Sequence, residues 1–148
     1  MQINHLAIVM NIQFNLVKIE NNQFAVFPEN LEEGEINVEN SFEFNVARDK
    51  THIKCTATSM YVCESNLVMK CQVSGLFMLS EQSWESITKE DELVVPSFFL
   101  QHMANIVVGI SRGIIFVKTE GLNVQSLPLP LIDLVSVIKE DLIIKISE

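Results

Sequence analysis

The sequence is short of positive charge: ten lysines and arginines stand against nineteen aspartates and glutamates, a formal net charge of −9 over 148 residues. Proteins bind nucleic acid and anionic lipid largely by neutralising phosphates with Lys and Arg. We therefore expect neither nucleic acid nor an anionic membrane surface as a partner. Hydrophobic residues make up 48% of the chain, which excludes a disordered protein and predicts one folded domain.

A long uninterrupted hydrophobic run is missing as well. The nearest candidate, Phe98–Val117, is interrupted by the polar residues Gln101, His102, Asn105 and Arg112. A helix that crosses a bilayer needs about 20 predominantly apolar residues. The first residues also lack the positive charge and the apolar length of a signal peptide. We expect no membrane insertion and a cytoplasmic location.

Cysteine is scarce, and its count is odd. Cys55, Cys63 and Cys71 follow no disulfide framework. A nucleophilic cysteine needs a nearby base and an electropositive setting, which this acidic chain does not offer. We predict three reduced thiols that are buried as small hydrophobic side chains.

Motifs for catalysis and metal binding are lacking too. None of the three histidines, His5, His52 and His102, has a Cys, His or carboxylate at metal-ligand spacing. The chain has no glycine-rich phosphate loop, no nucleophile elbow and no paired-carboxylate pattern. We predict no catalytic residue, no metal and no cofactor. Arg112 stands alone among apolar residues and is expected to donate hydrogen bonds to loop carbonyls or to a carboxylate.

The first half of the chain predicts β-strands. Residues 36–46 alternate almost without fault between apolar and polar, which is typical of a half-buried antiparallel strand. Asn21 and Asn22 interrupt the first strand and indicate a bulge. We expect one antiparallel sheet with four strands in meander order: Ile12–Phe27, Ile36–Val46, Ile53–Cys63 and Leu67–Leu79.

The second half predicts helices after a loop at Ser80–Glu92. Pro96 is favoured in the first turn of a helix, and this helix is expected to end at about Phe116 or Val117. Its polar stripe is too narrow for a surface helix. One face should therefore cover the sheet, and the other should meet a second helix or another subunit.

Asp133 is a suitable cap for a second, shorter C-terminal helix that ends near Ile144 or Lys145. A terminal strand over Leu142–Ile146 is the alternative. Strands followed by helices predict a single α+β domain over residues 1–148, a four-stranded antiparallel sheet with a long helix and this shorter one. Residues 1–11 are expected to be flexible or to form an additional segment.

Four short segments stand out by their order and spacing. Cys71–Phe77 ends a strand in Gly-aliphatic-Phe, and Ser111–Gly113 with Phe116 ends the long helix. Leu127–Asp133 is a Leu-Pro-rich segment that leads into the last helix, and Phe14–Pro28 is a strand that ends in Phe and Pro. Together they resemble the SecB family of protein-export chaperones and its SecB-like relatives, over about residues 14–134.

The resemblance implies a subunit in which two helices lie on one face of a four-stranded antiparallel sheet. It implies a homotetramer, a dimer of dimers with the long helices packed between the sheets. Members of the family bind unfolded polypeptides without ATP in long apolar grooves and deliver them to the translocation motor SecA. The implied function is thus an ATP-independent holdase for unfolded or pre-export polypeptides.

The resemblance also assigns residues by motif position. Alternate residues of one strand match positions tied to assembly and chaperone activity: Leu67, Met69, Cys71 and Val73. The second helix matches the element that lines the client-binding groove, and an early strand matches the opposite wall. The residues assigned to this groove are Ile36, Val38, Leu134, Val135, Ile138 and Leu142.

One departure from the family concerns SecA. SecB docks SecA through acidic residues on the outer face of its sheet, whereas the matching positions here are Lys70, Gln23 and Phe27. The resemblance is therefore closer to the SecB-like branch, some members of which protect antitoxins from aggregation. The alternative to a general holdase is a dedicated interaction module of the same fold with one defined partner.

Overall fold

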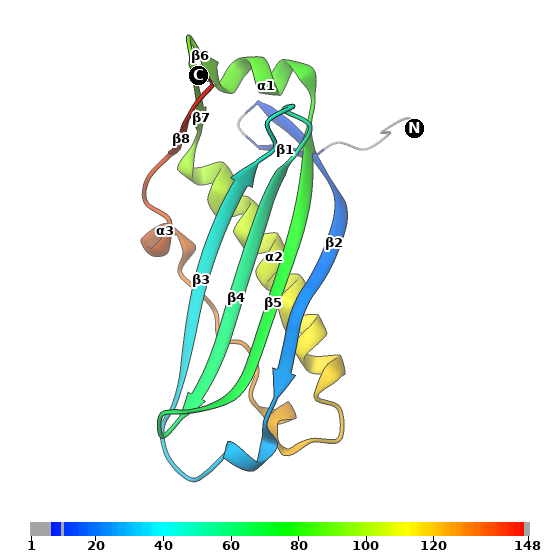
Figure 1. The fold of residues 1–148 in the computed structure, drawn as a ribbon, viewed down its shortest axis with the longest axis vertical. Coiled ribbons are helices and arrows are strands. Elements are labelled where there is room, and N and C mark those ends of the chain that lie inside the picture. Colours follow the sequence, from blue (N-terminus) through cyan, green and yellow to red (C-terminus); the bar gives the residue numbers. More distant parts are fainter. Residues whose placement is uncertain (1–6, 10, 147–148) are drawn as a thin grey trace.

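Five strands form the main sheet of the computed structural model, which describes residues 7–9 and 11–146 (Figure 1). Their order across the sheet is β1-β2-β5-β4-β3, and neighbouring strands are antiparallel. The four predicted strands are confirmed, and so is the bulge, because the register with β5 shifts between Asn21 and Gln23. The bounds are β1 Ala7–Val9, β2 Ile12–Val26, β3 Ile36–Val46, β4 Ile53–Cys63 and β5 Asn66–Leu79.

The strand β1 lies within residues 1–11, which were predicted to be flexible or to form an additional segment. Ala7–Val9 pair with Ile12–Phe14 of β2, so part of this segment is an additional strand at the edge of the sheet. Residues 1–6 and 10 lie outside the described residues.

The strand order contradicts the predicted meander. β2 pairs with β5 instead of β3, so the first long strand lies beside the last, in a Greek-key order. The short 3-10 helix η1 (Pro28–Asn30) follows β2. The backbone N–H of Phe27 donates to Val68 O, and the Asn30 side chain donates to Leu67 O. These bonds tie the end of β2 to β5, and the chain then crosses to the far edge of the sheet.

The inward face of the sheet packs against α2 (Ser97–Lys118), which confirms the long predicted helix. Phe14 of β2 contacts both layers: its ring centroid lies 5.1 Å from that of Phe99 on α2 and 6.1 Å from that of Phe77 on β5. The three cysteines are free and buried, as predicted. By length and composition alone α2 could cross a membrane, a test that the core helix of a soluble protein also passes.

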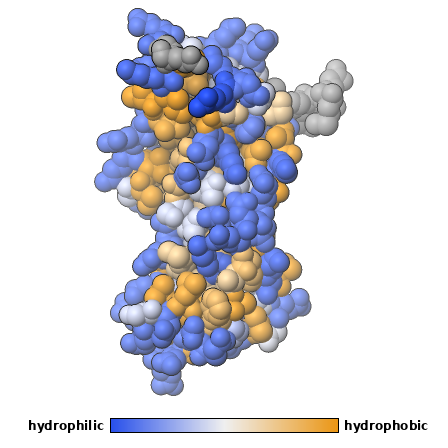
Figure 2. All heavy atoms as spheres, viewed as in Figure 1, coloured by the Kyte–Doolittle hydropathy of each residue, from blue (hydrophilic) through white to orange (hydrophobic). Residues whose placement is uncertain are grey.

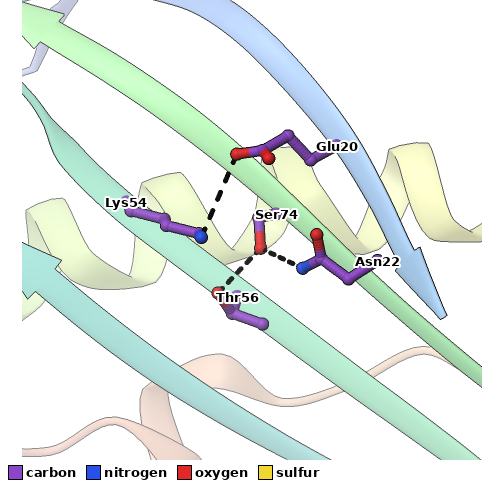
Figure 3. A network of polar contacts seen from close by, with 5 residues as sticks. All are labelled: Glu20, Asn22, Lys54, Thr56 and Ser74. Atoms are coloured by element: carbon purple, nitrogen blue, oxygen red, sulfur yellow. Dashed lines mark hydrogen bonds and ion pairs between the residues drawn. The ribbon is translucent and has the colours of Figure 1, made fainter.

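The outward face of the sheet carries polar side chains that contact one another between neighbouring strands (Figure 3). Ser74 is buried at the middle of β5, where its hydroxyl shares a 2.8 Å hydrogen bond with that of Thr56 and accepts a 2.7 Å bond from Asn22 Nδ2. On the same face, Lys54 Nζ lies 3.9 Å from a carboxylate oxygen of Glu20. The sheet therefore buries its apolar side chains mainly on one face, under α2.

Residues 80–95 do not form the predicted loop. They contain α1 (Glu81–Ile87) and two short strands, β6 (Thr88–Lys89) and β7 (Glu92–Val95). The Ser80 hydroxyl accepts a hydrogen bond from the Ser83 backbone N–H and so caps α1. The prediction weighed the acidic composition of this segment and missed the cap, which precedes two buried apolar side chains three residues apart, Trp84 and Ile87.

The second helix is much shorter than predicted. α3 covers only Leu134–Val137, and the chain then forms β8 (Leu142–Lys145), which adds to β7 in a three-stranded sheet of order β6-β7-β8. The Asp133 side chain accepts a hydrogen bond from the Ser136 hydroxyl and makes no cap to a backbone N–H. The prediction of a helix to Ile144 or Lys145 is wrong, whereas the alternative of a terminal strand is confirmed.

Candidate functional site

The first candidate surface is an apolar stripe on α2, on the side that the sheet leaves uncovered. Ile106, Ile110 and Ile114 are half-buried there, and Val117 is 67% exposed. Gly109 lies among them, and a β-carbon built on it would have no atom within 4 Å. The same holds for Gly113, which together with Gly109, Ile110, Ile114, Val117 and Lys118 lines a shallow apolar hollow. Small residues on an exposed helix face allow another helix to approach closely.

The second candidate surface, which we call the β3 groove, lies between β3 and the C-terminal segment. Phe42 and Phe44 of β3 and Leu100 of α2 form one side. Residues 137–142 form the other side, with Val137, Ile138 and Leu142 as apolar members. The groove has a volume of about 410 Å³ and opens widely to solvent.

Two hydrogen bonds hold the C-terminal wall of the β3 groove in place. Gln101 Nε2 donates to the backbone carbonyl of Ile138 at 2.7 Å. The backbone N–H of Ser97, at the start of α2, donates to the Asp141 carboxylate at 2.7 Å. A carboxylate at a helix N-terminus is favoured by the helix dipole. The wall is therefore attached to α2 at two points, although it contains little regular structure.

The prediction that Arg112 donates hydrogen bonds to loop carbonyls is confirmed. Its guanidinium donates to the backbone carbonyls of Leu129 at 3.1 Å and Pro130 at 2.9 Å. These bonds hold the Leu-Pro-rich segment beside the end of α2. Gly113, Phe116 and Leu127 complete a small apolar hollow there.

The predicted groove residues fall into two groups in the structure. Ile36 and Val38 are half-buried on β3, toward the end of the strand opposite to Phe42 and Phe44. Leu134 and Ile138 are each only 9% exposed and belong to the core of the subunit, whereas Val135 is 68% exposed. Leu142 is half-buried and lines the β3 groove. Because Leu134 and Ile138 are largely buried, they offer little surface to a client.

Sequence reasoning missed Phe42 and Phe44 as groove residues. The alternation of residues 36–46 places both phenylalanines on the same face as Ile36 and Val38. The signal was therefore present in the sequence, but the resemblance pointed only to the first two positions. The second wall of the groove depends on the fold of residues 138–146, which was predicted incorrectly.

The residues assigned to assembly lie in a central strand. Met69, Cys71 and Val73 are at most 1% exposed under α2, and Leu67 is half-buried at the start of β5. Their side chains support the core of the subunit, and only Leu67 retains exposed surface. Any effect of the other three on assembly would pass through the packing of α2 on the sheet.

Three residues were matched by the resemblance to the SecA contact of the SecB family. They are not acidic, and they lie near the outward face of the sheet. Lys70 is half-buried on β5 and Gln23 is exposed on the neighbouring β2. Phe27, just beyond β2, is 38% exposed. Figure 2 shows hydrophilic atoms across the middle of the visible face and hydrophobic atoms gathered toward both ends.

Titratable groups form no evident centre in the part of the chain that the structure describes. No three His, Cys, Asp or Glu residues there come close enough to hold a metal ion. Burial raises the pKa of the Cys55 thiol to about 12 and that of the Cys71 thiol to about 11. Both thiols are therefore protonated and weakly reactive at neutral pH.

The chain was compared with known proteins by sequence and by fold. No family model matches it, and no curated protein or solved structure shows a significant similarity. The sequence motifs and the surfaces described above are therefore the features that bear on its function.

Proposed function

We propose that this chain is a SecB-like, ATP-independent chaperone that binds unfolded polypeptides as a cytoplasmic homo-oligomer. The observation that carries the proposal is the amount of apolar surface left uncovered on one subunit. Apolar side chains that gather on an exposed surface, as on the α2 stripe and in the β3 groove, mark interaction surfaces. Among the described residues, five large apolar side chains are at least 60% exposed: Phe116, Val117, Leu131, Val135 and Ile143.

Two surfaces can share the tasks of assembly and client binding. The stripe on α2, with Gly109 and Gly113 at its centre, suits a second helix and supports the homotetramer that the resemblance implies. The β3 groove exposes aromatic and aliphatic side chains along an edge strand. Burial of apolar client side chains there is worth about 25 cal/mol per Å².

Net charge supports the same proposal. At −9 per chain, the particle repels its own copies and remains soluble despite its apolar surface. Unfolded clients with an excess of Lys and Arg should bind best. SecA is not included among the partners, because the outward positions at Lys70 and Gln23 carry no negative charge.

The central test is light scattering from two unrelated unfolded proteins diluted into buffer with this protein and no nucleotide. A general holdase suppresses the aggregation of both at near-equimolar oligomer. Suppression of neither, with the oligomer intact, would contradict the proposal and favour a dedicated module with one partner.

The β3 groove is tested with Val137→Asp. Val137 lines the groove and is 53% exposed, so the subunit should still fold. The variant should lose most of its ability to suppress aggregation, because the aspartate places a charge where apolar side chains of a client would bind. Ile143→Asp is the matched control, since Ile143 is 60% exposed and does not line the groove. Equal activity of the two variants would contradict the groove assignment. Ile138→Asp is unsuitable because Ile138 is buried.

The assembly surface is tested with Val117→Asp. Val117 lies on the α2 stripe, and its exposed fraction of 67% nearly equals the 68% of Val135 on α3. Val117→Asp should dissociate the oligomer in size-exclusion chromatography with light scattering. Val135→Asp makes the same chemical change outside the stripe and should leave the oligomer intact. If both variants, or neither, dissociate, α2 does not form the assembly surface.

A further inference from the structure

A further hollow lies next to the β3 groove, toward the end of the molecule that carries the three-stranded sheet. It has a volume of about 640 Å³ and separates β8 from the turn between β3 and β4. Leu93 of β7 and Ile144 of β8 pair in register, and together with Val46 they give it an apolar wall. Its size is within the range of sites that enclose small ligands or short peptide segments.

Three cations line this cleft, and no carboxylate does. Arg48 and Lys50 come from the β3–β4 turn, and Lys145 comes from β8. They are three of only ten lysines and arginines in a chain with nineteen acidic residues. Within the described ranges, none of the three forms an ion pair, and the one such pair joins Lys54 to Glu20. Their concentration at one cleft therefore calls for an anionic partner.

Carboxylates in the neighbourhood do not neutralise these cations. Asp49, Glu81 and Glu85 share an adjacent hollow with Lys50, and Glu92 pairs in register with Lys145. None lies within 4.0 Å of a lysine or arginine nitrogen in the described part of the chain. They would limit binding to partners that reach into the cleft, rather than to any anion.

The backbone of β8 adds a second mode of recognition. β8 is an edge strand, with β7 on one side and no strand paired on the other among the described residues. Ile144 and Lys145 are neighbours on β8 and both line the cleft, although successive side chains of a strand point to opposite faces. The unpaired edge of β8 must therefore form part of the cleft wall, where it can hydrogen-bond another extended chain.

We propose that this cleft binds an extended acidic peptide segment in which carboxylate and apolar side chains alternate. The segment adds to the free edge of β8 by backbone hydrogen bonds. Its apolar side chains contact Leu93 and Ile144, and its carboxylates pair with Arg48, Lys50 and Lys145. A lone anion would leave the apolar wall empty, and a fatty acid would leave the strand edge unpaired. The cleft adjoins the β3 groove, because Val46 and Ile144 each lie two residues beyond a groove residue, but none of its three cations lines that groove. The proposal does not depend on the proposed function.

The probe is a short fluorescein-labelled peptide in which aspartate or glutamate alternates with valine or leucine, followed by fluorescence anisotropy. The wild-type chain should bind it, and binding should weaken as salt is added. A peptide with asparagine and glutamine in place of the acids should bind at least about tenfold more weakly, since a charge-assisted hydrogen bond is roughly twice as strong as a neutral one. Absence of binding by the acidic peptide, or equal binding by its neutral counterpart, would overturn the proposal.

Two further comparisons locate the site. Arg48→Glu with Lys50→Glu should abolish binding, whereas Lys18→Glu with Lys89→Glu, which changes the net charge equally at exposed lysines outside the cleft and the β3 groove, should not. Equal loss in the two double variants would show that only overall charge matters and would refute the site. N-methylation of alternate peptide bonds in the probe should also weaken binding, because it removes the donors that pair with β8. An unchanged affinity would refute strand addition.

Discussion

Gly75 of β5 packs closely against Val107 of α2, so a methyl group added there should destabilise the protein. A β-carbon built on Gly75 would lie 3.0 Å from Val107 Cγ2, 3.1 Å from Phe77 Cε2 and 3.2 Å from Leu16 Cδ1. All three distances are shorter than ordinary van der Waals contacts between carbon atoms. Val107 and Phe77 are fully buried, so neither can move aside without disturbing the core.

The magnitude for Gly75→Ala follows from two opposing effects. Overpacking of a well-packed core costs about 1–3 kcal/mol. Loss of glycine's freedom in the unfolded chain returns about 0.4–1 kcal/mol. The net loss of unfolding free energy is about 1–2 kcal/mol, which lowers the Tm of a chain of this size by about 2–8 °C.

Gly109→Ala is the matched control, because the same methyl group there meets no atom within 4 Å. In the middle of a helix, alanine is favoured over glycine by about 1 kcal/mol, so this variant should gain stability. Both variants are unfolded with urea and with heat, followed by circular dichroism, over a protein dilution series that reveals any contribution from assembly. If Gly75→Ala is as stable as the wild type, the close approach of α2 to the sheet is wrong.

Three further predictions concern polar and titratable side chains. Tyr61→Phe should keep or raise the unfolding free energy, by up to about 1 kcal/mol in urea titrations, because the buried Tyr61 hydroxyl has no hydrogen-bond partner among the described residues. Arg112→Ala should lower it by about 2 kcal/mol and increase proteolysis near Leu129, since two charge-assisted bonds are lost. The free energy of unfolding should also decrease in alkali. Burial raises the pKa of Tyr61 and Cys55 to about 12 and that of Cys71 to about 11. In the unfolded chain the thiols titrate near 9.0 and the phenol near 10.0. The unfolded state then releases protons first, so the urea midpoint should be constant below about pH 9 and should decrease above it.

The sequence predicts the strands of this fold well because their pattern is local. Residues 36–46 alternate between apolar and polar except at Asn40, and Asn21 with Asn22 marks the bulge. The long helix is equally clear, since Pro96 precedes an apolar run. The strand order is not local: the β2–β5 ladder runs from the pair Phe14–Leu79 to the pair Val26–Met69, so partners lie about 40 to 65 residues apart in the chain.

The C-terminal segment shows where periodicity is ambiguous. Leu134, Ile138 and Leu142 are spaced as on one face of a helix, yet Leu142 and Ile144 also alternate as in a strand. The pairing of β8 with β7 decided the outcome, and no strand was predicted at β7, which begins at Glu92, the last residue of the predicted loop. The β3 groove could not be predicted correctly for the same reason, because its second wall is this segment.

The position of β2 beside β5 also has a consequence for how the chain folds. β3, β4 and β5 are joined by short turns, so their ladders can form while only a few residues lie between the strands. The β2–β5 ladder pairs Phe14 with Leu79 and must close a loop that contains the whole β3–β4 hairpin. Formation of this ladder should be slow, because contacts distant in sequence limit folding rates. Until it forms, β5 presents an open edge, the kind of surface through which incompletely folded chains aggregate. A protein that we propose to protect unfolded chains would thus pass through an aggregation-prone state of its own.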